Sequence, residues 1–177
     1  MDAMTPTSIL SALGITRSIS QGTGKIIALV GGGGKTTLAF NIAMQAAGSA
    51  KLRVVVTTTT KMMLPHYSRI RCGSVELSGD CPVVLDEEND EVIEKLRSIF
   101  AQEADSDAAA RGSFAFLASK ADPDPRYQGR RCIGIDPRLP RILLDAGVCD
   151  LVVVEADGFV VLMGVCSVSV VQCCYQD

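Results

Sequence analysis

The stretch Ile27-Ala-Leu-Val-Gly-Gly-Gly-Gly-Lys-Thr-Thr-Leu38 decides how the chain folds. It begins inside Lys25-Ile-Ile-Ala-Leu-Val30, a short apolar run that is typical of a buried parallel strand. After it, residues 36–47 predict a helix whose apolar side chains are spread around the axis, with Gly48 as its stop. The sequence therefore predicts a strand, a tight glycine turn and a helix.

Outside this unit, strands and helices continue to alternate. Residues 7–14 predict a short capped helix, and residues 86–102 predict a helix with an acidic start and one apolar face. Residues 121–131 are rich in Pro, Asp and Arg and predict an exposed loop, and residues 142–147 predict a short helix. Further strands are expected at residues 53–56, 83–85, 114–118 and 150–155. This alternation predicts an α/β domain with a mainly parallel sheet.

The glycine turn has the chemistry of a phosphate-binding loop. Glycine permits the required torsions and leaves the backbone N–H groups open to phosphate oxygens. Lys35 would meet the terminal phosphates, Thr36 would offer a hydroxyl to magnesium, and Thr37 opens the helix. The backbone of the loop is supplied by Gly31, Gly32, Gly33 and Gly34. We therefore expect a P-loop NTPase-like, three-layer domain that binds ATP or GTP with Mg²⁺.

The loop departs from the full pattern, which leaves room for other interpretations. In Gly-x-x-x-x-Gly-Lys-[Ser/Thr] the first glycine would fall at Leu29, so the loop is a shortened variant. A glycine turn with a surface lysine is the plain alternative. A dinucleotide site is disfavoured because the second strand ends at Thr57 without an acid for the ribose. Ser119-Lys-Ala-Asp122 lacks the Asn of a guanine-reading motif and is taken as coincidental.

An acid at the end of a neighbouring strand would complete such a site. Glu155-Ala-Asp157-Gly158 offers two, and we assign Asp157 and Glu155 to catalysis, with Asp157 and Thr36 on the metal. An acid in Asp-Gly after a strand is otherwise a common turn residue. In the Thr57 to Thr60 run, Thr58 and Thr59 are candidate hydroxyls for a terminal phosphate or an acceptor, although threonine also simply favours strands.

Composition narrows the class of protein. The chain has 177 residues and a net charge of −3, without the basic block that tracks a phosphate backbone, so no nucleic-acid partner is expected. The apolar run 159–171 is shorter than the ~20 residues of a membrane span. The start has no secretory pattern, which predicts a cytoplasmic protein without a membrane role. The seven cysteines and single histidine, His66, form no metal or disulfide pattern.

Three segments together resemble the YqeC family of selenium-dependent hydroxylase accessory proteins. They are the glycine stretch ending at Leu38, Val54-Val-Val-Thr-Thr-Thr-Thr-Lys-Met62, and Leu151-Val-Val-Val-Glu-Ala-Asp-Gly158. Residues from Lys120 to Gly134 are similar to the stretch that leads into that family's final motif, so the resemblance covers about residues 7–158. It implies an accessory role in maturing molybdenum-containing hydroxylases, with such an enzyme or its cofactor as partner.

After Gly158 the resemblance ends. Residues 1–158 are expected to form the nucleotide-binding domain, and residues 159–177 a divergent tail with three of the seven cysteines. The favoured interpretation of the tail is a truncated or wrongly assigned end; the alternative is a native strand of the sheet. Three functions stay open: a Mg-dependent NTPase or kinase-like enzyme, a nucleotide-dependent switch without turnover, and an inactive remnant.

Overall fold

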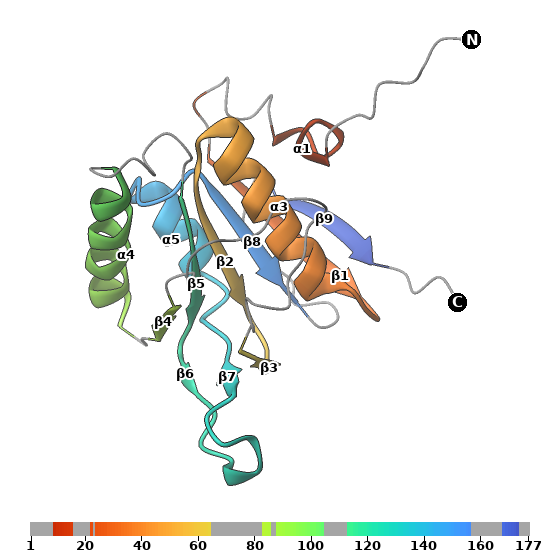
Figure 1. The fold of residues 1–177 in the computed structure, drawn as a ribbon, viewed down its shortest axis with the longest axis vertical. Helices are drawn as coiled ribbons and strands as arrows, with labels where there is room; N and C mark the ends of the chain where they lie inside the picture. The colour runs from red at the N-terminus through yellow and green to blue at the C-terminus, as the bar shows by residue number, and fades with distance from the viewer. Residues whose placement is uncertain are drawn as a thin grey trace.

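A computed structural model describes residues 9–15, 22, 24–64, 83–85, 88–104, 113–156 and 168–173. Its centre is a parallel six-stranded sheet with strand order β4-β5-β2-β8-β1-β9 (Figure 1). The strands are β1 Lys25–Gly31, β2 Arg53–Thr58, β4 Val83–Leu85, β5 Ser113–Ala118, β8 Leu151–Glu155 and β9 Val168–Cys173. The expected α/β class and mainly parallel sheet are confirmed.

Helices cover both faces of the sheet because strand side chains alternate between them. Ile27 of β1 and Val54 of β2 are buried on the face of α1 and α3, whereas Ile26 and Val55 are buried on the face of α4 and α5. The helices are α1 Ile9–Ala12, α3 Lys35–Ala50, α4 Asn89–Ala104 and α5 Leu139–Asp145. The arrangement is a three-layer α/β/α domain in which the central strands contain buried apolar runs, such as Val54–Val56 of β2 and Leu151–Val154 of β8.

A small antiparallel sheet lies at the carboxyl ends of the large sheet's strands, and its strand order is β3-β7-β6. Its strands are β3 Met62–Met63, β6 Lys120–Ala121 and β7 Arg131–Ile133, and the 3-10 turn η3 Pro125–Tyr127 caps the hairpin between β6 and β7. Because β3 follows β2 and β6 follows β5, this sheet lies beyond the carboxyl ends of the parallel strands, where Figure 1 shows the hairpin projecting.

Several expectations from the sequence need correction. Helix α3 does not stop at Gly48; it ends at Ala50 and is capped by Lys51, whose φ is 57° and whose N–H donates to the Ala46 carbonyl. The segment 121–131 is not an exposed loop throughout, since it contains η3 and the start of β7, and Asp122 is buried. Helix α5 begins at Leu139 rather than Ile142. Within the described ranges, no helix is long and apolar enough to cross a bilayer.

The remaining expected elements lie close to their predicted positions. The strand at 83–85 has the predicted bounds, and the expected strands 53–56, 114–118 and 150–155 correspond to β2, β5 and β8. The helix expected at 86–102 is α4, which runs from Asn89 to Ala104. The helix expected at 7–14 is described from Ile9, and its proposed cap, Thr7, lies outside the described residues.

Part of the segment assigned to a divergent tail belongs to the sheet. Strand β9 pairs in parallel with β1 from Ile26↔Val168 to Gly31↔Cys173. For residues 168–173, the structure thus agrees with the second interpretation of the tail, a native strand of the sheet. The pairing covers the backbone edge of β1, the strand that leads into the glycine loop.

Deleting residues 168–177 should lower the melting temperature by at least about 5 °C or abolish cooperative unfolding, because it uncovers the edge of β1. Thermal denaturation followed by circular dichroism measures this. Deletion of residues 174–177 alone is the control and should leave the transition in place. An unchanged transition in the longer deletion would contradict a structural role for β9.

Candidate functional site

The carboxyl ends of three neighbouring parallel strands bring the predicted site together. Strand β8 lies between β1 and β2, and its last residue, Glu155, is in register with Leu29 on one side and Thr58 on the other. The glycine loop follows β1 and the threonine run ends β2. Glu155 therefore lies between the loop and the run at one edge of the sheet.

The glycine loop requires glycine at its entrance and again where the helix begins. Gly31 has φ 114°, and a Cβ there would lie 2.1 Å from the carbonyl oxygen of Cys173. The N–H of Gly32 donates to the same carbonyl at 3.3 Å, so β9 fixes the start of the loop. Gly34 is the N-cap of α3 with φ 69° and makes no side-chain cap. A Cβ at Gly32 or Gly34 would meet no atom of the described residues within 4 Å, so they leave this part of the loop open.

The side chains after the loop contact both neighbouring elements. The Lys35 ammonium donates to the Gly31 carbonyl at 2.8 Å and so folds back over the loop. The Thr36 hydroxyl donates to the Glu155 carboxylate (Oε2) at 2.8 Å, across 119 positions of sequence. Thr37 lies in the first turn of α3, as expected. The bond from Thr36 to Glu155 joins the two oxygen groups expected near a metal.

The four threonines have different environments. Thr57 donates its hydroxyl to the Leu117 carbonyl at 2.8 Å, and the Thr58 hydroxyl accepts from the Thr60 N–H at 3.1 Å. The Thr59 N–H donates to the Glu155 carbonyl at 3.2 Å, which ties the run to β8. The Thr59 hydroxyl oxygen is buried and has no hydrogen-bond partner among the residues described. A buried hydroxyl without a partner costs about 1–3 kcal/mol of stability. In this respect Thr59 differs from the other three threonines of the run.

Gly134 is part of the site's wall and was not assigned a role from the sequence. A Cβ there would lie 2.4 Å from the backbone of Thr59 and Thr60, so only glycine allows this contact. The next residue, Ile135, donates its N–H to the Thr58 carbonyl at 2.8 Å. A glycine between two apolar residues, Ile133 and Ile135, often marks a place where another backbone comes close, and this was the available sequence signal.

Cys132 of β7 is a second unassigned residue beside the site. It is fully buried, and its thiol donates to the Met62 carbonyl at 3.5 Å. Burial raises the pKa of this thiol, and the charge of Glu155 adds to the effect. Cys132 is therefore a neutral thiol near neutral pH, and it packs as a small apolar side chain.

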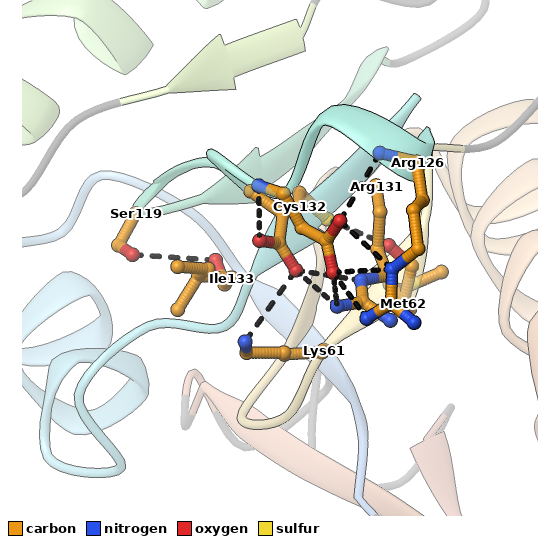
Figure 2. Close-up of polar contacts among 9 residues, drawn as sticks. Lys61, Met62, Ser119, Arg126, Arg131, Cys132 and Ile133 are labelled. Atoms are coloured by element: carbon orange, nitrogen blue, oxygen red, sulfur yellow. Dashed lines mark hydrogen bonds and ion pairs between the residues drawn. The ribbon is translucent and has the colours of Figure 1, made fainter. Parts of the chain in front are cut away.

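A buried carboxylate joins the hairpin to the residue that follows the threonine run (Figure 2). Asp122 has a side chain only 2% exposed and accepts from Arg131 (Nε) at 2.6 Å. The Asp124 N–H also donates to it at 3.0 Å, and Lys61 approaches within 3.5 Å. The Asp124 N–H, followed by Arg131 and Lys61, holds the pKa of Asp122 below its usual value. The Arg131 guanidinium lies 3.5 Å from the centre of the Tyr127 ring.

Sequence reasoning missed this network because Asp122 was attributed to an exposed loop. Glu155 was assigned and lies at the centre of the site, whereas Asp157 lies outside the described residues, and its catalytic and metal roles stay predictions. Thr58 is brought to the site, but its hydroxyl is used inside the turn. Thr59 is the member of the pair whose hydroxyl is left over.

The fold and this edge define an α/β protein in which a glycine loop, a threonine run and an acidic residue meet at the carboxyl ends of parallel strands. A family model described as YqeC protein matches residues 27–159. The chain therefore belongs to the YqeC family, as its motifs indicated. Neither the curated proteins nor the solved structures gave a match.

Gly31→Ala should destabilise the protein by about 1–3 kcal/mol, because it adds a strained backbone and a collision with the Cys173 carbonyl. Gly32→Ala is the matched control in the same loop, since a Cβ there meets nothing within 4 Å. Chemical denaturation of both variants measures the free energies of unfolding. Equal stability of the two would disprove the contact between β9 and the loop.

Proposed function

We propose that this edge binds a nucleoside triphosphate with Mg²⁺, and that the protein is an NTPase or kinase-like accessory factor in the maturation of molybdenum- or selenium-dependent hydroxylases. The observation that carries the proposal is the 2.8 Å bond between Thr36, directly after the glycine loop, and Glu155 on the adjacent strand. A hydroxyl and a carboxylate held together are ligand groups for Mg²⁺, and the glycine loop beside them offers backbone N–H groups to phosphate oxygens.

The residues present fit a triphosphate. Helix α3 is 16 residues long and begins at a glycine without a capping side chain, so its first N–H groups lie toward the loop and favour an anion. Among the described residues, no atom lies within 4 Å of a Cβ built at Gly32 or Gly34. Lys35 is already held at the loop through the Gly31 carbonyl and supplies the positive charge. The loop and Lys35 would therefore hold the phosphates.

The residues also fit a magnesium ion. Mg²⁺ takes oxygen ligands, and when bound it neutralises phosphate charge and polarises the phosphoryl group. Thr36 would offer its hydroxyl oxygen to the ion. Glu155 would offer its carboxylate, either directly or through a bound water. Asp157, two residues further on, keeps its proposed role on the metal or water. The neutral thiol of Cys132 adds no competing charge beside Glu155.

The accessory role rests on family membership. The match to the YqeC family over residues 27–159 is consistent with an accessory protein of selenium-dependent hydroxylases. Nucleotide turnover would then drive a step of cofactor assembly, or occupancy alone would switch a partner enzyme. Phosphate release measured with and without a hydroxylase partner separates these two, since a switch binds nucleotide without steady release.

Lys35→Ala should weaken binding of ATP and GTP at least about tenfold, because a charge-assisted contact to phosphate is lost. The fold should persist, since Lys35 is only half-buried and its ammonium donates to the backbone of the loop. Isothermal titration calorimetry measures the affinity, and a thermal melt without nucleotide checks the fold. Unchanged affinity for both nucleotides in a folded variant would refute the proposed phosphate site.

Glu155→Gln should lower Mg-dependent phosphate release about 10–100-fold while changing nucleotide affinity less, because the amide cannot supply the charge that organises the metal. The amide can still accept the Thr36 hydrogen bond, so the fold should be kept. Asp157→Asn, assayed in parallel, should also impair release more than binding. Full release by both variants would remove the acids of this segment from the mechanism.

A further inference from the structure

We infer that strand β9 restrains nucleotide binding through the peptide unit that joins Gly31 to Gly32. In the structure this peptide has a closed orientation, with its N–H bonded to β9 and its carbonyl bonded to Lys35. Phosphate binding requires the reverse orientation, in which the N–H meets the anion. The inference rests on the proposed function, because it concerns the regulation of the same site.

Both polar groups of this peptide are hydrogen-bonded. The Gly31 carbonyl accepts from the Lys35 ammonium at 2.8 Å, and the Gly32 N–H donates to the Cys173 carbonyl of β9 at 3.3 Å. The two groups of a trans peptide point in opposite directions, and the described residues contain no cis peptide bond. The carbonyl therefore faces the side of the loop lysine, whereas the N–H is turned toward the neighbouring strand.

The closed orientation is unfavourable for a phosphate. A phosphate-binding loop presents backbone N–H groups to the anion, whereas this peptide presents a carbonyl oxygen, which repels it. The same oxygen holds Lys35, the side chain proposed to meet the phosphates. Rotating the peptide would turn the Gly32 N–H toward the anion and release the lysine. The rotation changes only ψ of Gly31 and φ of Gly32, and glycine is the residue whose torsions are least restricted.

Strand β9 opposes this rotation. Cys173 is in register with Gly31, and its carbonyl oxygen lies so close that a Cβ on Gly31 would be 2.1 Å away from it. After rotation the Gly31 carbonyl would face the Cys173 carbonyl, and two acceptors that face each other leave both unsatisfied. The end of β9 must therefore move aside when the peptide rotates. Both orientations of the peptide are ordered, so the cost lies in lost hydrogen bonds and not in ordering the loop.

Only the last pair of the β1–β9 ladder reaches the loop. The ladder runs from Ile26↔Val168 to Gly31↔Cys173, so its earlier pairs can hold β9 in the sheet while its end moves. Strand β9 also lies outside residues 27–159, the part of the chain that matches the family model. The restraint therefore comes from a segment beyond the proposed nucleotide site, and it can be altered without changing the loop.

Two truncations that differ by one residue test the restraint. Deleting residues 173–177 removes the Cys173 carbonyl, so affinity for ATP with Mg²⁺ should rise at least about threefold, because the loop N–H loses a competing acceptor. Deleting residues 174–177 keeps Cys173 and ends it in a carboxylate, a stronger acceptor, so affinity should not rise. Calorimetric titration measures both, and a thermal melt without nucleotide checks that each chain is folded. Unchanged or weaker binding in the shorter chain would overturn the inference.

A pair of substitutions tests the same contact in the full chain, without a new terminus. Cys173→Pro should raise nucleotide affinity, because proline has no N–H and a fixed φ and so disrupts the last pair of the ladder. Cys173→Ala is the matched control, since it keeps the backbone carbonyl and removes only the thiol. It should bind ATP as the unaltered chain does. Equal affinities of the two variants would contradict the inference.

Hydrogen exchange gives a second measurement, because coupling between two sites is reciprocal. If β9 weakens nucleotide binding, then nucleotide must loosen the end of β9. Saturating ATP with Mg²⁺ should therefore speed amide exchange in the peptide that covers residues 168–177. The same concentration should have little effect on Lys35→Ala, which binds more weakly. Slower exchange in this peptide with ATP would show that nucleotide and β9 favour the same state, and would overturn the inference.

Failure of the restraint and failure of the proposed function give different results. If the full chain binds ATP or GTP and neither the 173–177 deletion nor Cys173→Pro binds more tightly, the nucleotide site stands and the restraint is wrong. If neither the full chain nor the 173–177 deletion binds either nucleotide, the proposed function is wrong and the restraint falls with it. Binding by the deletion alone would support both.

Discussion

The site depends on the hydrogen-bonded placement of β8 between β1 and β2. Parallel pairing on both sides fixes Glu155 opposite Leu29 and Thr58, and a slip of one residue would turn its side chain to the other face. Apolar burial enforces this register, since Val152, Val153 and Val154 of β8 are fully buried between the two helical layers. The hydrophobic core thereby sets the 2.8 Å contact between Thr36 and Glu155.

The architecture around this edge was predictable from the sequence because its signals are local. An apolar run, a glycine turn and a helix-forming segment each determine their own conformation, and parallel strands end at a common edge. Thr36 and Glu155 could therefore be assigned to one site before the structure was known. Family motifs pointed to the same residues, and the match over residues 27–159 agrees with them.

The missed parts depend on contacts between distant segments. Asp122 lies among Pro, Asp and Arg residues, a composition that predicts an exposed loop, yet Arg131 and the Asp124 N–H satisfy its charge and allow its burial. Gly134 is required only because the Thr59 and Thr60 backbone lies against it, 74 or more positions away in the chain. The length of α3 was underestimated because a single Gly48 weakens a helix by about 1 kcal/mol, which tertiary packing overcomes.

Backbone contacts on two sides give the site its rigidity. On one side the Cys173 carbonyl of β9 meets Gly31, and on the other the backbone of Thr59 and Thr60 meets Gly134. Both glycines occur where a Cβ would collide with main chain, which cannot move aside as a flexible side chain can. The glycine loop is therefore held by β9 of the large sheet, and the threonine run is held by the segment that directly follows β7. Phosphate binding at the glycine loop, as proposed, would cost little ordering entropy, because the backbone that presents the donors is already fixed.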